Sequence, residues 1–328
     1  MRVFSGMPLL ALLLALVFAP MGALTGAALG AEPATIAITP VKVGAHSWYV
    51  QGRSGMVSEA NQGYNANAGF VVTREGVVVF DVLGTPPLGE AYLKAIRRIT
   101  AKPVKLVVIS HYHADHFYGL AAFRRAGARI WAHRAAEGYL ASEAPAARLA
   151  ERCTSLARWV DCATPVVAPD RYLDGDEHFR LGGLDFLVQH VGPAHTPEDL
   201  MLTVRQDGVA FVGDLIFAGR VPFVGDADSR SWLGAIDKLL ASRPRVLVTG
   251  HGRHSDKPGQ DLLVTREYLL YLRDAMGAAV RDFVPFEEAF AKTDWSRFSH
   301  LPAFAAANRI NAFGTYIRME QESLAAPK

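Results

Sequence analysis

Residues 105–116 read KLVVISHYHADH, and this stretch decides both the fold class and the chemistry of the chain. Its first half, Lys105 to Ile109, is a short apolar run typical of a buried strand. Its second half places four ligand-type side chains within six residues: His111, His113, Asp115 and His116. Imidazoles and carboxylates suit zinc and other first-row divalent ions, and a loop at a strand end can turn several of them towards one point. The stretch therefore predicts a metal site.

Three more ligand-type side chains occur downstream, each after or near an apolar strand. They are His195 in GPAHT, Asp214 in VGD and His251 in GHG. Loops at strand ends collect the functional residues of α/β folds. Seven ligands are enough for two metal ions if one carboxylate bridges them. The isolated histidines outside this pattern are interpreted as structural or surface residues: His46, His178 and His300.

Strand and helix patterns on both sides of residues 105–116 predict two similar halves. We expect strands at 48–51, 68–72, 77–80, 105–109, 129–132, 179–181, 184–190, 200–204, 209–212 and 246–249. We expect helices at 87–98, near 119–126, at 134–158, at 231–241 and from 261 onward, with breaks at Pro285 and Pro302. Strands followed by helices in each half indicate an α/β sandwich of two sheets with helices outside.

The N-terminus has the order of a secretory signal peptide. Arg2 is its only charge, Pro8 to Ala19 is apolar, and residues 28–32 read ALGAE, a small-residue region before a cleavage site. Cleavage after Gly30 or Ala31 would begin the mature chain near residue 31. Proline and glycine between residues 20 and 26 interrupt a spanning helix, so an uncleaved anchor is the weaker alternative. We therefore expect a periplasmic protein without stable membrane insertion.

The chain has two cysteines, Cys153 and Cys162, and export would place them in an oxidising compartment. A disulfide between them would close a short loop and contribute about 2 to 3 kcal/mol. The alternative is a pair of buried free thiols.

Size and charge set the remaining bounds. The 328 residues, half of them hydrophobic, can form one large core. A net charge of +2 without a basic run argues against nucleic acid and favours a small-molecule substrate. We expect three segments: a signal peptide at 1–30, a main domain at 31–258, and a helical extension at 259–328 packed on that domain.

The HxHxDH motif followed by separate His, Asp and His resembles the metallo-β-lactamase superfamily, over roughly residues 40 to 255. The resemblance implies a four-layer αββα sandwich with two metal ions. It also implies that Asp81 fixes the position of the ligand loop without binding a metal ion itself. The implied ligands are His111, His113 and His195 for the first metal and Asp115, His116 and His251 for the second, with Asp214 as the bridge.

Further residues narrow the resemblance to one branch. The family's β-lactamases generally lack an Asp at the position of Asp214, whereas the glyoxalase II-like hydrolases keep it. Residues 67–73 (NAGFVVT), 219–226 (GRVPFVGD) and 301–309 (LPAFAAANR) are similar to exported metallohydrolases associated with quinoprotein dehydrogenase relays and sulfur oxidation. Glu198 is a departure, because the family often has glycine there. This difference concerns the conformation of the local turn and leaves the expected role of His195 as a metal ligand unchanged.

The resemblance implies a hydrolase with two divalent metal ions, zinc in the first place and iron or manganese as alternatives. A hydroxide shared by the metals would attack a thioester, ester, lactone or amide. Asp115 is expected to orient this hydroxide and pass a proton. No organic cofactor is expected.

Three alternatives stay open at this point. They are a promiscuous or genuine β-lactamase, a persulfide dioxygenase with a single iron, and a non-catalytic periplasmic metal-binding partner of a dehydrogenase. Four residues near the motifs are not assigned to the substrate pocket: His133, His190, His254 and Arg220. Arg220 could bind a substrate carboxylate, but an exposed loop residue is the simpler interpretation. We interpret His190 as packed under the site.

Overall fold

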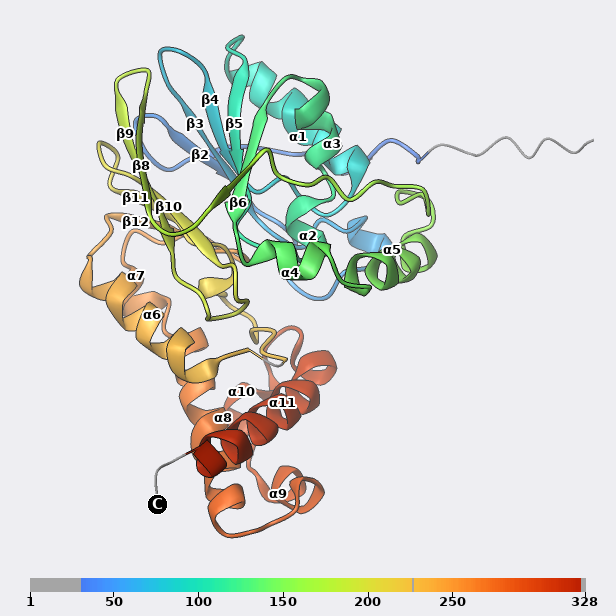
Figure 1. Ribbon diagram of the computed structural model, residues 1–328, viewed down its shortest axis with the longest axis vertical. Coiled ribbons are helices and arrows are strands. Elements are labelled where there is room, and N and C mark those ends of the chain that lie inside the picture. The colour runs from blue at the N-terminus through green and yellow to red at the C-terminus, as the bar shows by residue number, and fades with distance from the viewer. Residues whose placement is uncertain (1–30, 226, 326–328) are drawn as a thin grey trace, which may run out of the picture. The chain divides into compact units, whose positions relative to one another are not determined.

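Two β-sheets packed face to face form the centre of the fold, seen in a computed structural model that describes residues 31–225 and 227–325 (Figure 1). The predicted signal peptide at 1–30 lies outside the described residues. The described residues form one compact unit. No helix among them has the length and apolar character needed to cross a membrane.

The first sheet has seven strands in chain order, β1 to β7. Strands β1 to β4 pair antiparallel, and β4 to β7 pair parallel. The strands are β1 Val41–Lys42, β2 Ser47–Val50, β3 Ala68–Val72, β4 Val77–Phe80, β5 Val104–Val108, β6 Arg129–His133 and β7 Arg171–Leu173.

The second sheet has five strands in the order β12-β11-β10-β9-β8. Strands β11 and β12 pair parallel, and the other pairs are antiparallel. Consequently β9, β11 and β12 run in one direction, and their carboxyl ends share one edge. The strands are β8 Glu177–Leu181, β9 Leu184–His190, β10 Leu200–Val204, β11 Val209–Phe211 and β12 Val246–Val248.

Helices cover the outer face of each sheet. Helices α1 (Pro86–Ile99) and α3 (Leu120–Arg125) pack on the first sheet, where Tyr92 and Phe123 join one apolar cluster with Val107. Helices α6 (Ser229–Ala241) and α8 (Val264–Arg281) pack on the second sheet through a cluster that includes Trp232 and Leu269. The predicted αββα sandwich is confirmed.

The C-terminal segment is helical, as expected, and breaks near both prolines. Its helices are α7 Pro258–Asp261, α8, α9 Phe286–Lys292, α10 Ser296–Ser299 and α11 Phe304–Ala325. Helix α11 packs against α8, where Tyr268 donates a hydrogen bond to Asn308 (2.7 Å). Asn311 of α11 also accepts from the backbone N–H of Val224, at 2.8 Å. The C-terminal segment therefore contacts the loop that contains Val224, which follows Asp214 in the chain.

The single helix predicted at 134–158 was wrong. The structure has two helices there, α4 (Ala136–Leu140) and α5 (Ala144–Ser155). Pro145 lies in the first turn of α5, where no intrahelical N–H is needed, and it cannot continue a preceding helix. The predicted disulfide between Cys153 and Cys162 is present and ties the end of α5 to the following loop.

An apolar layer fills the space between the two sheets. Side chains on the two faces of strand β4 enter different apolar clusters. Val77 and Val79 pack under the helices, while Val78 and Phe80 pack in the layer between the sheets. The Phe80 ring lies 6.0 Å from the ring of Phe211 on β11. Residue 69 must be glycine, because a Cβ there would overlap the Phe211 ring.

We predict that Phe211→Ala lowers the free energy of unfolding by about 3 to 5 kcal/mol, because it empties a fully enclosed site between the sheets. Urea denaturation followed by circular dichroism measures this. The matched control is Phe283→Ala, since the Phe283 side chain is 92% exposed and should cost almost nothing. Equal losses in the two variants would contradict the assigned core.

Candidate metal centre

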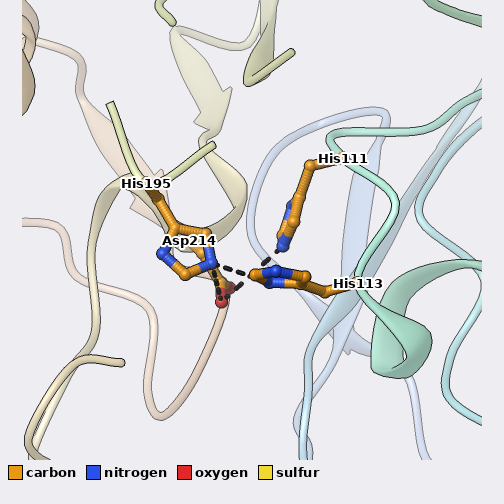
Figure 2. Close-up of side chains that lie close together, drawn as sticks. All are labelled: His111, His113, His195 and Asp214. Carbon is orange, nitrogen blue, oxygen red and sulfur yellow. Dashed lines mark hydrogen bonds and ion pairs between the residues drawn. The ribbon is translucent and has the colours of Figure 1, made fainter. Parts of the chain in front are cut away.

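All seven predicted ligands come together at one edge of the sandwich. Strand β5 ends just before His111, and β9, β11 and β12 end just before His195, Asp214 and His251. Helix α2 (Ala114–Phe117) carries Asp115 and His116 and has His113 at its N-cap, while Asp214 lies in the 3-10 turn η2 (Gly213–Leu215). Figure 2 shows His111 and His113 from the first half pointing towards His195 and Asp214 from the second.

The ligand atoms form two groups, each within 4.8 Å. Asp214 lies between them: its Oδ1 is 3.2 Å from His116 Nε2, and its Oδ2 is 3.3 Å from His251 Nε2. The same Oδ2 is 3.4 Å from His195 Nε2 and 3.9 Å from His111 Nε2. One carboxylate thus contacts both groups, as the bridging hypothesis requires. The groups are His111, His113, His195 and Asp214, and Asp115, His116 and His251.

The outward nitrogens of three histidines are already held. Nδ1 of His111 is 2.9 Å from Ser110 Oγ, Nδ1 of His116 is 2.9 Å from Asp81 Oδ2, and Nδ1 of His251 is 2.8 Å from the Asn65 carbonyl. Each Nε2 is therefore the nitrogen left for a ligand. In the described residues, Nε2 of His111 and His116 and Oδ1 of Asp214 are buried without a hydrogen-bond partner.

Burial keeps part of the cluster uncharged. It lowers the pKa of His111 and His113, and it lowers the pKa of His195 to about 3. Neutral imidazoles keep a lone pair for a metal ion. His195 Nε2 and His113 Nδ1 face each other at 2.9 Å. Because buried polar atoms without partners are costly, this donor set fits divalent metal ions.

Asp81 holds the ligand loop, as the resemblance implied. It accepts hydrogen bonds from the backbone N–H of Ser110 (2.8 Å) and from Ser110 Oγ (2.7 Å), besides its contact with His116 Nδ1. Its φ is +59°, a left-handed conformation that Asp tolerates better than most residues. Because β4 and β5 are parallel, Asp81 and the ligand loop emerge at the same edge.

Asn65 and Glu198 also organise the site, and sequence reasoning did not assign either role. Asn65 Nδ2 donates to Asp115 Oδ2 at 2.8 Å, and its carbonyl accepts from His251, so it fixes two ligands. Buried Glu198 accepts from the backbone N–H of Tyr112 at 3.2 Å and so links the loop of His195 to the HxHxDH loop. One indication of these roles was present in the sequence: Glu198 occupies a position where the family often has glycine.

The prediction that Arg220 is an exposed loop residue was wrong, because the residue is buried. Its Nη1 donates to the Gly55 carbonyl at 2.6 Å and lies 3.4 Å from His251 Nδ1. Its guanidinium lies 5.6 Å from the centre of the Phe217 ring. Burial lowers the pKa of Arg220, which remains a cation at neutral pH.

The other unassigned histidines make structural contacts. His133 and His190 stack with ring centres 3.5 Å apart, and His190 Nε2 lies 2.9 Å from the Pro197 carbonyl. His190 thus supports the His195 loop, although it is partly exposed rather than packed under the site. His254 Nδ1 lies 2.9 Å from the Tyr49 hydroxyl. His46 pairs with Asp207.

The comparisons with known proteins agree with this geometry. Residues 62–251, more than half of the chain, match the model of the metallo-beta-lactamase superfamily. Metallo-beta-lactamase IND-1 of Chryseobacterium indologenes is 24% identical over 57% of this chain and 72% of its own length. The linear primary-alkylsulfatase of Pseudomonas sp. (strain ATCC 19151) is 22% identical over 61% of this chain and 44% of its own length.

A solved structure extends the likeness to the helical tail. The sec-alkylsulfatase Pisa1 from Pseudomonas sp. superposes with a TM-score of 0.67 at 19% identity. The match covers 89% of this chain and 52% of the sulfatase. This chain therefore spans about half the length of the sulfatases it resembles, and at this identity the likeness speaks for the fold alone.

We predict that Asp81→Asn weakens metal affinity by about 10- to 100-fold, because the amide cannot accept from Ser110 and His116 as the carboxylate does. Competition with a chromophoric chelator measures the affinity. Asp237→Asn on the surface of α6 is the matched control and should leave it unchanged. Equal affinities in the wild type and Asp81→Asn would refute the supporting role.

Proposed function

This chain belongs to the metallo-β-lactamase superfamily of hydrolases, and we propose that it cleaves a thioester, ester, lactone or amide bond with two divalent metal ions, zinc first among them. The observation that carries the proposal is Asp214, whose two oxygens contact both groups of ligands. The proposed ligands are His111, His113 and His195 for one ion and Asp115, His116 and His251 for the other, with Asp214 between them.

Metal ions at such a site supply a nucleophile from water at neutral pH and stabilise the negative charge that develops on an attacked carbonyl. The chain's own residues do the positioning. Asp81 and Asn65 fix the orientation of His116, His251 and Asp115 before a substrate arrives. Geometry held in advance needs no reorganisation during the reaction.

Asp115 is the residue we assign to orienting the attacking water. It lines the cavity at the ligand cluster, and the Asn65 amide holds its Oδ2. Its other oxygen lies 4.0 Å from His116 Nε2. A carboxylate fixed in this way can accept a hydrogen bond from a water in one orientation and pass on its proton.

The relatives suggest two further kinds of substrate bond that should be tested for cleavage together with those above. The likeness to metallo-beta-lactamases supports a β-lactam amide, and the likeness to alkylsulfatases supports a sulfate ester. A panel of one thioester, one lactone, one β-lactam and one alkyl sulfate separates these reactions. One iron per chain with thiol-dependent oxygen uptake would replace the hydrolase proposal with a dioxygenase.

We also propose export to the periplasm and association with a dehydrogenase there. Support for export comes from the order of charge, apolar run and small residues in 1–30, and from the disulfide, which is typical of oxidising compartments.

We predict that Asp214→Ala loses one metal ion and nearly all turnover while the fold survives. The missing carboxylate removes the contact between the two ligand groups, but it leaves the apolar layers untouched. Metal content per chain, turnover and circular dichroism are measured together on the purified variant. Full activity with unchanged metal content would refute the bridging assignment.

We predict that Asp115→Asn lowers kcat more than it raises KM, because the amide keeps the shape of the side chain but takes up protons poorly. Steady-state kinetics on the best substrate of the panel measures the split. Asp185→Asn, at an exposed site on β9, is the control. An unaltered kcat would remove the proposed role of Asp115.

A further inference from the structure

A cavity of about 120 Å³ opens onto the ligand cluster. Five members of the cluster line it, so a group bound here lies against the proposed metal ligands. The same lining includes three arginines, Arg148, Arg152 and Arg220, that the metal site does not use. Arginine is the residue best suited to binding carboxylate, sulfate or phosphate groups.

Acidic side chains outside the ligand cluster compensate only part of the charge of these arginines. Among the residues that the structure describes, the carboxylates in the lining are Asp115 and Asp214, and both belong to the ligand cluster. Arg148 and Arg152 both pair with Glu151, at 3.2 and 3.3 Å.

Arg220 differs from the other two in its partners, which are two carbonyls, His251 Nδ1 at 3.4 Å and Met56 Sδ at 3.9 Å. Within residues 31–225 and 227–325, it has no carboxylate partner, and it donates to the carbonyls of Gly55 and Val221. When bound metal ions compensate Asp115 and Asp214, the three arginines set against Glu151 leave the cavity wall with a surplus of positive charge.

Helix α5 places two of the three arginines on one face. Arg148 and Arg152 are four residues apart, a spacing that puts both side chains on the same side of a helix. The disulfide of Cys153 and the packing of Leu149 against Leu156 and Trp159 fix the helix. Figure 1 shows α5 at the same end of the sandwich as α2, which carries two ligands.

A second cavity, of about 560 Å³, adjoins the first and shares His113, His195 and Phe223 with it. Aromatic rings of Tyr112 and Tyr139 add to its lining. Among the described residues, two carboxylates also line it, but each already accepts from a backbone N–H: Glu198 from Tyr112 and Asp228 from Ser231. This space, whose lining also includes Arg318, offers aromatic and apolar contacts to a group bound beside the ligands.

We propose that the substrate is an organic anion with an apolar or aromatic body: the three arginines bind its anionic group, and the body occupies the cavity beside Phe223. The inference rests on the proposed hydrolase function, since it names the substrate class of the same site. Guanidinium groups bind carboxylate and sulfate through paired, charge-assisted hydrogen bonds, which set orientation as well as affinity. The cleaved bond would then lie over the ligand cluster.

The first test measures binding without catalysis. Calorimetric titration compares 4-phenylbutyrate with the neutral 4-phenylbutan-1-ol, and hexane-1-sulfonate, which has no ester bond to cleave, with 1-hexanol, on the metal-loaded protein and after chelator treatment. We expect each anion to bind at least about tenfold more tightly than its neutral partner on the metal-loaded protein, because the arginines supply contacts that an alcohol cannot use. After metal removal the preference should shrink but persist, since Asp115 and Asp214 are then uncompensated while the arginines stay in place. Raising the NaCl concentration should weaken only the anions.

The variant for this test is Arg148→Gln, since the Arg148 side chain is 47% exposed and its loss spares the fold. We expect about three- to tenfold weaker binding of the anions and unchanged binding of the alcohols. Arg180→Gln removes the same charge from an exposed site on β8 outside the cavity and is the matched control. Equal binding of anion and alcohol, or anion binding unaffected by Arg148→Gln, overturns the proposal.

A second test separates this inference from the proposed function. The glutaryl and pentanoyl thioesters of one thiol differ in a terminal carboxylate, so Arg148→Gln should raise KM for the glutaryl thioester alone and leave kcat nearly unchanged. Hydrolysis without any preference for the anion would refute the arginine site and keep the hydrolase. Charge-dependent binding without hydrolysis of any panel substrate would refute the hydrolase and keep the site.

Discussion

The contact of one buried carboxylate, Asp214, with histidines from both halves of the chain is the interaction on which the site depends. Its oxygens lie 3.2 to 3.4 Å from the Nε2 atoms of His116, His195 and His251. Burying a carboxylate is costly unless cations or hydrogen-bond donors compensate. The parallel directions of β9, β11 and β12 bring His195, Asp214 and His251 to one edge, and β5 of the first sheet leads to His116 there. The topology of the two sheets and the chemistry of the cluster therefore require each other.

Around this contact, a set of polar side chains fixes the ligands from outside. Asp81 holds the HxHxDH loop, Asn65 joins the loop of His251 to Asp115, and Glu198 joins the loop of His195 to Tyr112. Each of these contacts crosses between segments far apart in the sequence. Orientation of this kind is what metal ligands need from their surroundings. The apolar layer between the sheets, with Phe80 against Phe211, keeps these segments in place.

The ligand cluster and the fold were predictable because their signals are local. The apolar run before His111 marks a strand, and four ligand-type side chains within six residues are typical of a metal site. The burial of Arg220, the role of Asn65 and the convergence of Arg148 and Arg152 on the cavity were not predictable, since each depends on where a loop or helix packs. The break between α4 and α5 was missed although Pro145 marked it, because alanine and charged residues on both sides favour helix.

The direct test of the central claim is an anomalous difference map, measured at the zinc absorption edge, from crystals of the protein grown with zinc. The account predicts two peaks about 3.5 to 4 Å apart, one on each side of the Asp214 carboxylate. One peak lies near His111, His113 and His195, and the other near Asp115, His116 and His251. A single peak at full occupancy, or two peaks that leave Asp214 uncoordinated, would contradict it.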